Sequence, residues 1–246
     1  MTDWFIDTHC HLDLIQGIQQ KYIDEDALPI KTISVTNTPS FFQQNQVLFK
    51  DAQNVRVAIG MHPELVSQFC VELELFMSLL PETRYVGEIG LDGSERFKAS
   101  FGIQHEIFKE IIKACADSKD KIITVHTRNA EKEAVFLLKK YLKKSECKVI
   151  LHWFTGNIEA FTDAMNAGFY FSINHKMTIT KKGQELIERI PRDRLLTETD
   201  APFTLDGKVT RLDSLGSCIN RMAKILNKEP EDIKTDIFKN FHSLLL

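Results

Sequence analysis

The sequence WFIDTHCH at residues 4–11 places a short apolar run directly before polar side chains that can bind a metal ion. The same change occurs at five further points along the chain. The apolar runs are short and rich in β-branched residues, which is typical of strands. The predicted strands are Trp4–Asp7, Thr32–Val35, Val55–Ile59, Tyr85–Ile89, Ile122–His126, Val149–His152, Phe169–Ser172 and Leu195–Thr199. Six of these eight strands therefore run into His, Glu or Asp.

Longer segments with a helical spacing of apolar residues separate the predicted strands. They include 101–115, 130–141, 180–190 and 215–226. In the first segment, the face predicted to be buried consists of Ile103, Ile107, Phe108, Ile111 and Ile112. This alternation predicts an α/β protein, a (β/α)8 TIM-like barrel. A doubly wound open sheet is the alternative, but the chain lacks the glycine-rich turn that its nucleotide site would need after the first strand.

Composition sets the class of protein. No repeat, low-complexity tract or linker interrupts the 246 residues, so we expect one domain over residues 1–246. A hydrophobic fraction of 43% with a charged fraction of 26% excludes a disordered or fibrous chain. No apolar run approaches the roughly 20 residues of a membrane helix, and no signal peptide is visible. Five scattered cysteines are typical of free thiols in a reducing compartment, so we expect a cytoplasmic protein without membrane contact.

The polar residues at the strand ends predict a metal centre, because the carboxyl ends of barrel strands meet at one mouth. The candidate ligands are His9, His11, Glu88, His126, His152 and Asp200. His9 and His11 alternate along a strand and so point to one side. Buried titratable groups are costly without a counter-ion, and a divalent metal supplies one. A polar mouth with internal salt bridges remains the alternative.

Four imidazoles and two carboxylates exceed the needs of one tetrahedral ion, so we expect two divalent ions. His9, His11, Glu88 and Asp200 would hold the first ion, and Glu88, His126 and His152 the second. The expected chemistry is hydrolysis by a metal-bound hydroxide, with Glu88 as the bridge and Asp200 as the general base. This imidazole-rich set suits zinc. The net charge of −3 gives no basic field for nucleic acid, so a polyanionic substrate would depend on such a local positive site.

Six segments together resemble the TatD family of metal-dependent nucleases, a branch of the amidohydrolase-like barrels. They are Asp7–Asp13, Gly60–Pro63, Val86–Asp92, His126–Ala130, His152–Gly156 and Glu198–Pro202, in the family's order. The resemblance implies 3′→5′ hydrolysis of DNA, single-stranded or at 3′ ends, supported by Mg or Mn. It also implies that His62 and Arg128 contact phosphate. Glu88 stands where other branches carry a carbamylated lysine, which favours the nuclease branch.

Longer stretches at 33–40, 79–85 and 191–194 are similar to the QatD members of the family. This similarity implies anti-phage defence together with the other Qat cassette proteins, among them an ATPase and a QueC-like enzyme. Gly93 and the segment 209–213 depart from the family pattern, so the DNA-binding rim is expected to be altered. The alternatives are a metal hydrolase of a small molecule or modified nucleobase, and a cassette subunit that is active only with its partners or serves as a binding module.

Overall fold

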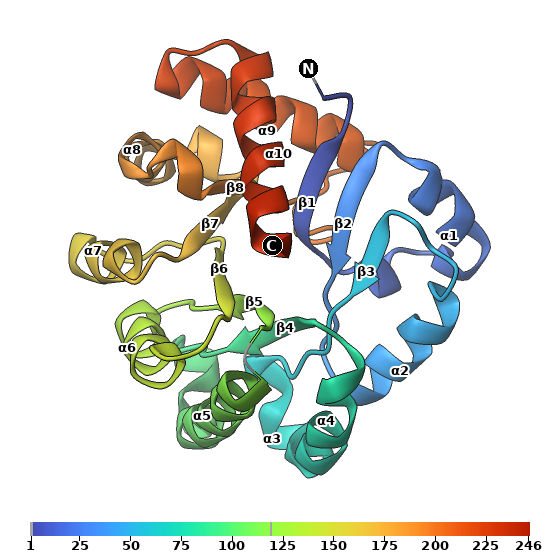
Figure 1. The fold of residues 1–246 in the computed structure, drawn as a ribbon, viewed down its shortest axis with the longest axis vertical. Helices are drawn as coiled ribbons and strands as arrows, with labels where there is room; N and C mark the ends of the chain where they lie inside the picture. Colours follow the sequence, from blue (N-terminus) through green and yellow to red (C-terminus); the bar gives the residue numbers. More distant parts are fainter. Residues whose placement is uncertain (1, 119) are drawn as a thin grey trace. The chain divides into compact units, whose positions relative to one another are not determined.

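The computed structural model describes residues 2–118 and 120–246. All eight predicted strands are present and alternate with helices along the chain (Figure 1). The strands are β1 (Phe5–Cys10), β2 (Ile30–Ser34), β3 (Val55–Val57), β4 (Tyr85–Gly90), β5 (Ile122–His126), β6 (Lys148–His152), β7 (Tyr170–Ile173) and β8 (Leu195–Thr197). The helices are α1 (Ile18–Ala27), α2 (Pro39–Leu48), α3 (Val66–Phe69), α4 (Leu73–Leu79), α5 (Phe101–Ser118), α6 (Glu131–Leu142), α7 (Ile158–Asn166), α8 (Lys181–Arg189), α9 (Arg211–Leu226) and α10 (Pro230–Leu245).

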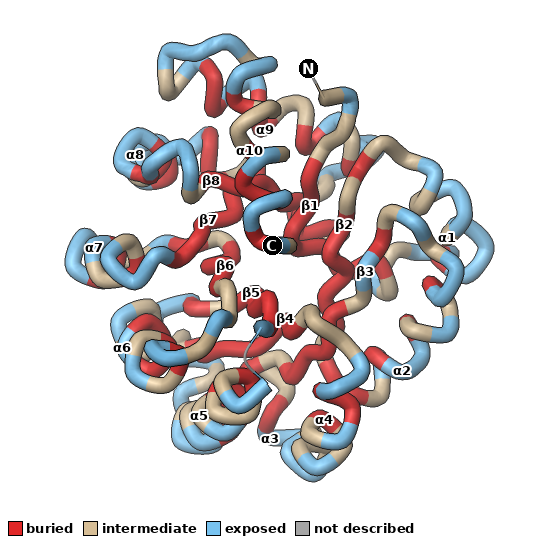
Figure 2. Tube along the Cα trace, in the orientation of Figure 1, coloured by how far each residue is buried: buried red, intermediate tan, exposed pale blue. Residues whose placement is uncertain are grey.

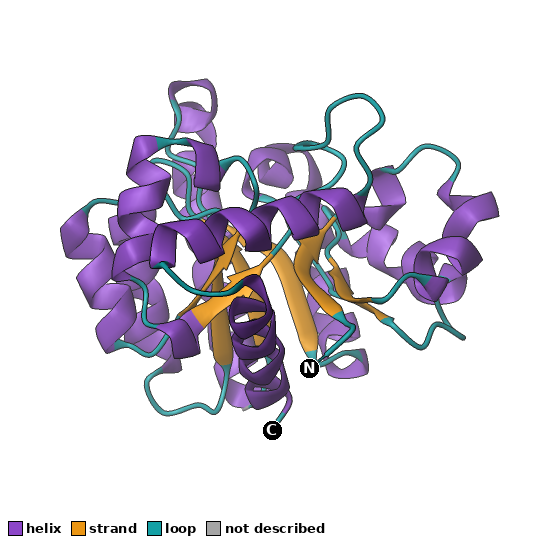
Figure 3. Ribbon diagram, turned by 90° about the horizontal axis from the view of Figure 1, so that it is seen from above, coloured by secondary structure: helices purple, strands orange, loops and turns teal. Residues whose placement is uncertain are grey.

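The chain forms two compact units. Unit 1 comprises Met1–Ser34, Leu48–Arg56 and Tyr170–Leu246. Within it β1 pairs with β2 and β7 pairs with β8, both in parallel. The C-terminal helix α10 packs against β1 and β8, and Figure 3 shows it beside the strands. Helix α9 begins with a capping box in which the side chains of Thr210 and Asp213 satisfy free backbone N–H groups.

Unit 2 comprises Val35–Val47 and Val57–Phe169. Strands β4, β5 and β6 lie in parallel, with Tyr85 opposite Ile122 and Ile122 opposite Lys148. Helix α6 packs against α5 on one side and α7 on the other. Parallel strands require a crossover between them, and these helices provide it. The expectation of a single domain over residues 1–246 stays a prediction.

The strands supply most of the buried core, whereas each helix keeps an exposed side (Figure 2). On α5, Ile107, Phe108, Ile111 and Ile112 are buried as predicted. The prediction for Ile103 was wrong, because its side chain is 45% exposed. At 100° per residue, Ile103 lies about 110° from the centre of the buried stripe, so it falls on the edge of that face.

Strand β8 ends two residues earlier than predicted. The backbone N–H of Thr199 donates to the Asp7 carboxylate at 2.8 Å, so the chain leaves the parallel ladder at this point. This departure carries the following residue, Asp200, into a left-handed conformation with φ 51°. Among the described residues, no helix is long and apolar enough to cross a membrane.

Candidate metal centre

Three imidazoles of unit 2 surround one carboxylate oxygen, Oε1 of Glu88. This oxygen lies 2.8 Å from Nδ1 of His126, 3.3 Å from Nε2 of His62 and 4.0 Å from Nε2 of His152. Glu88 lies in β4 and is 2% exposed, while His126 and His152 end β5 and β6. Adjacent parallel strands therefore bring these side chains together, as the strand-end pattern predicted.

A close backbone approach places His62 in this cluster. A Cβ atom on Gly60 would lie 1.6 Å from the carbonyl oxygen of Thr36 and 2.7 Å from the backbone nitrogen of Glu88, so only glycine fits. The next residue, Met61, donates its N–H to the carbonyl of Glu88 at 2.9 Å, and His62 donates to Asn37 at 2.9 Å. The chain after β3 is thereby attached to β4 just before His62.

The hydrogen bonds of His62 set its neutral tautomer. Its Nδ1 accepts the backbone N–H of Glu64 at 3.2 Å, which leaves the proton on Nε2. Nε2 is the atom that faces Glu88. The neutral ring of His62 therefore presents a hydrogen-bond donor to the cluster, unlike a metal ligand, which presents a lone pair.

Asp92 is a second carboxylate partner of His126 that the sequence analysis did not assign. Nε2 of His126 lies 2.9 Å from Asp92 Oδ2, so each ring nitrogen faces a carboxylate. Burial lowers the pKa of His126, but the hydrogen bonds with Asp92 and Glu88 outweigh it and raise the pKa to about 9. Burial raises the pKa of Asp92, but hydrogen bonds from His126 and Ser94 outweigh it and hold the pKa below its usual range. Asp92 lies in the quoted segment Val86–Asp92, which was the available signal.

Unit 1 holds a second group of predicted ligands. Oδ1 of Asp200 lies 3.9 Å from Nε2 of His9 and 3.7 Å from Nε2 of His11. The backbone N–H of Asp200 donates to the carbonyl of His9, and that of His11 to Ala201, both at 2.8 Å. These two bonds join the end of β1 to the segment after β8. His9, His11 and Asp200 are all buried.

A buried ion-pair network also joins β1 to the segment after β8 and to α9. The carboxylate of Asp7 accepts hydrogen bonds from the backbone and hydroxyl of Thr199 and from the guanidinium of Arg211 at 2.9 Å. The same guanidinium donates to Glu25 and Thr32. Arg211 belongs to the segment predicted to alter the DNA-binding rim, but its side chain is 3% exposed and points into unit 1. This structural role was not predicted from the sequence.

Glu198 is a further buried carboxylate of unit 1 that the sequence analysis did not assign. It is fully buried and accepts hydrogen bonds from the hydroxyl of Ser172 and, at 2.9 Å, from the side-chain amide of Asn174. Its position two residues before Asp200 in a stretch of polar residues was the only signal. The two hydrogen bonds fix the position of its carboxylate within unit 1.

The predicted ligands are of the kinds that bind divalent metal ions in proteins. In unit 2, Oε1 of Glu88 lies 2.8 Å from Nδ1 of His126 and 4.0 Å from Nε2 of His152. Imidazole nitrogens suit Zn, Mn or Fe, whereas Mg prefers oxygen ligands. The six predicted ligands thus fall into two groups: Glu88, His126 and His152 in unit 2, and His9, His11 and Asp200 in unit 1.

The other predicted contacts lie in loops of unit 2. Arg128 follows β5 and is exposed, and among the described residues its guanidinium has no ion pair. Phe154 is 1% exposed and packs in the core. Trp153 is half-buried, with its ring edge-on to His152.

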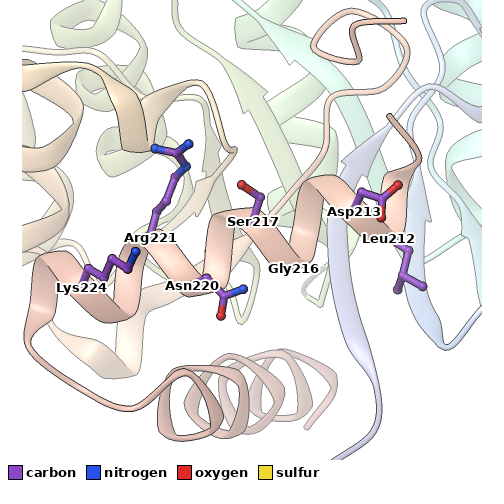
Figure 4. Close-up of a pocket in the computed structure, with 7 residues that line it drawn as sticks. All are labelled: Leu212, Asp213, Gly216, Ser217, Asn220, Arg221 and Lys224. Carbon is purple, nitrogen blue, oxygen red and sulfur yellow. The ribbon is translucent and has the colours of Figure 1, made fainter. Parts of the chain in front are cut away.

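A shallow hollow of about 590 Å³ follows one face of α9 (Figure 4). Its lining residues are Leu212, Asp213, Gly216, Ser217, Asn220, Arg221 and Lys224. None of the predicted site residues lines it. The candidate chemistry therefore belongs to the two histidine and carboxylate groups, not to this hollow.

The sequence is similar to known proteins over nearly its whole length. A family model described as TatD related DNase matches residues 6–246. The chain belongs to this family. An uncharacterized metal-dependent hydrolase of Methanocaldococcus jannaschii is 27% identical over 96% of this chain and 94% of its own length. A human protein named 3′-5′ RNA nuclease is 26% identical over 86% of this chain and 30% of its own length. This TatD-family chain is a metal-dependent hydrolase.

The structure of an Escherichia coli TatD homolog, YjjV, has the same fold. Its TM-score is 0.88, with 23% identity, and the match covers 99% of this chain and 98% of the homolog. The predicted α/β fold of the (β/α)8 barrel class is thereby confirmed. The predicted activity is confirmed at the level of a metal-dependent hydrolase from a family with nuclease members.

Proposed function

We propose that this TatD-family chain is an exonuclease that removes nucleotides from the 3′ end of DNA. The observation that carries the proposal is the convergence of the imidazoles of His62, His126 and His152 on Oε1 of Glu88. The group of His9, His11 and Asp200 in unit 1 supplies the remaining predicted ligands. The family's description as DNase supports DNA as the substrate.

Two divalent ions would be held by His9, His11, Glu88, His126, His152 and Asp200. Such ions, when bound, activate water and neutralise charge on a phosphate. Resemblance to the family favours Mg or Mn, whereas the number of imidazoles favours Zn. Glu88 is proposed as the bridging ligand because three imidazoles already surround one of its oxygens.

The protein's own side chains would orient the phosphate and accept a proton. Asp200 is 6% exposed, and its carboxylate can take the proton of the attacking water. His62 presents an N–H at Nε2, which can donate to a phosphate oxygen that enters the cluster. The exposed guanidinium of Arg128 can bind a phosphate through two hydrogen bonds.

We further propose that the setting is anti-phage defence with the other proteins of the Qat cassette. The support is the similarity of the segments 33–40, 79–85 and 191–194 to QatD members. Co-purification with the cassette's ATPase and QueC-like enzyme, and phage plating with the Asp200→Asn variant, would test this setting. Full protection by the inactive variant would contradict a nuclease role in defence.

The activity itself is tested with end-labelled single- and double-stranded DNA and with RNA, in Mg, Mn or Zn. We expect stepwise release from the 3′ end of DNA, reduced roughly 10²- to 10⁴-fold in His126→Ala and Asp200→Asn. His242→Ala is the control, because His242 lies exposed on α10. Faster release of nucleotides from RNA than from DNA would indicate RNA as the preferred substrate, as the name of the human relative states for that protein. No release from any strand by metal-loaded protein would contradict the proposal.

A further inference from the structure

Phe203 exposes a large aromatic side chain directly beside a predicted metal ligand. Its side chain is 63% exposed, whereas His11 is 2% exposed. The two ring centroids lie 5.3 Å apart at an interplanar angle of 80°. In this edge-to-face arrangement one ring meets the other with its edge, so the aromatic surface of Phe203 is left largely open to solvent. Phe203 is neither a proposed metal ligand nor a proposed phosphate contact.

The turn that carries Phe203 is anchored at both ends within unit 1. The carbonyl of Ala201 accepts the N–H of His11 at 2.8 Å, and the hydroxyl of Thr204 donates to the carbonyl of Thr199. Ala201 and Thr204 are fully buried. Because the backbone is held before and after it, the exposed ring of Phe203 has a defined position. The exposure belongs to the folded turn, not to a loose loop.

An exposed phenylalanine elsewhere in the chain provides a comparison. Phe136 on α6 is 55% exposed, and the Nζ of Lys140 lies 5.9 Å from its ring centroid. Over the ring of Phe203 no cation is seen among the residues that the structure describes. A single exposed aromatic is ordinary on a helix surface. What distinguishes Phe203 is its rigid position against a ligand of the proposed catalytic metal.

We propose that Phe203 is the stacking platform for the base of the terminal nucleotide. The inference rests on the proposed exonuclease function, since it requires a nucleotide whose phosphate reaches the metal ligands. The base of that nucleotide would then lie close to His11, where the ring of Phe203 offers a flat apolar surface. Base–aromatic stacking tolerates any base, which suits an enzyme that shortens strands of mixed sequence. The chemical class of ligand is therefore a nucleobase at a strand end.

A second role for the same ring must be separated from stacking. Phe203 also covers His11, and an apolar cover alone would shield a metal site from water. Leucine at position 203 would keep an apolar cover of similar size but would lack a π-face. Tryptophan would keep both. The variants Phe203→Leu and Phe203→Trp therefore distinguish cover from stacking, with Phe136→Leu as the matched control on α6.

The experiment uses DNA with the fluorescent base 2-aminopurine at the 3′ end. DNA with the same base well inside the strand is the control for quenching that is not specific to the end. Each variant is first assayed for bound metal, so that damage to the metal site is seen directly. We expect Phe203→Leu to retain its metal, to lose the stacking-induced quenching of the terminal 2-aminopurine, and to bind the end roughly 5- to 100-fold more weakly. Phe203→Trp and Phe136→Leu should resemble the wild type. Cleavage of an end that lacks its terminal base should be insensitive to Phe203→Leu.

The outcomes separate this inference from the exonuclease proposal. Wild-type cleavage of DNA with equal quenching and affinity in Phe203→Leu would overturn the stacking role and leave the nuclease intact. Loss of metal from Phe203→Leu with unchanged affinity for DNA would show that the ring acts only as a cover, which also overturns it. Metal-loaded wild type that neither quenches nor cleaves any strand would overturn both proposals together.

Discussion

His126 has a carboxylate at each ring nitrogen, Glu88 at Nδ1 and Asp92 at Nε2. In the metal-free protein this arrangement favours the imidazolium, which donates to both carboxylates, and it raises the pKa to about 9. A metal ion needs a neutral nitrogen with a free lone pair. The proton and the metal therefore compete for the same ring, and Asp92 is placed to orient the ring whichever of them is bound.

Metal-free protein should therefore lose stability as the pH rises. The pKa of His126 is about 9 in the folded chain against an unfolded value of 6.5. The folded state binds the extra proton, so this stabilisation is complete below pH 6.5 and disappears as the pH rises through about 9. The free energy of unfolding should fall by up to about 3 kcal/mol over this pH range. Because the pKa of Asp92 is lowered, this carboxylate stays charged throughout the pH range in which His126 titrates, and its contribution to the free energy of unfolding is constant there.

Urea unfolding between pH 6 and 10 in the presence of a chelator measures this effect. The His126→Gln variant is the reference, because it removes the titrating ring and keeps every other ionisable group. The free energy of unfolding of the wild type should fall relative to this variant across the window. Parallel curves for the two proteins would show that His126 does not gain a proton on folding.

At the scale of elements, the candidate ligands at the strand ends could be predicted from the sequence, but the long-range contacts that hold these strand ends together could not. Apolar runs before His126 and His152 indicated both the strands and the candidate ligands, because parallel strands end at one edge. The partner of Asp7 is Arg211, 204 residues further along the chain, and only the folded path of α9 brings the two together. No local sequence pattern predicts a contact between residues so far apart in the chain. The short β8 has the same origin, since Thr199 bonds to Asp7.

The Arg211→Met variant should lose about 3–5 kcal/mol of unfolding free energy, because it leaves the buried Asp7 carboxylate without its cation. The comparison variant is Arg192→Met, whose partner Asp236 lies on the surface, and it should lose less than about 1 kcal/mol. Adding Asp7→Asn to Arg211→Met should restore part of the stability. Chemical denaturation of the four proteins provides the measurement. Equal losses for the two arginine variants would contradict a larger contribution from the buried ion pair of Asp7 and Arg211.

At the scale of the whole molecule, the proposed ligands are distributed over most of the sequence, from His9 to Asp200. An unfolded chain holds them far apart, so a divalent ion binds the folded state in preference. Such a ligand stabilises the fold by RT ln(1 + [L]/Kd), which is about 2.7 kcal/mol at a hundredfold excess over Kd. The metal is therefore expected to act on the stability of the chain as well as on its chemistry.

Removal of metal with a chelator should lower the Tm of the wild type, and addition of Mn or Zn should restore it in a concentration-dependent manner. The His152→Ala variant, which lacks a ligand of unit 2, and the His9→Ala variant, which lacks one of unit 1, should each show a smaller shift. The His242→Ala variant should shift like the wild type, since this histidine is exposed on α10. Differential scanning calorimetry with metal analysis gives both the shift and the number of ions. If His9→Ala kept the full shift while His152→Ala lost it, the ion that stabilises the chain would be held by unit 2 alone, and the ligand role of His9 would be wrong.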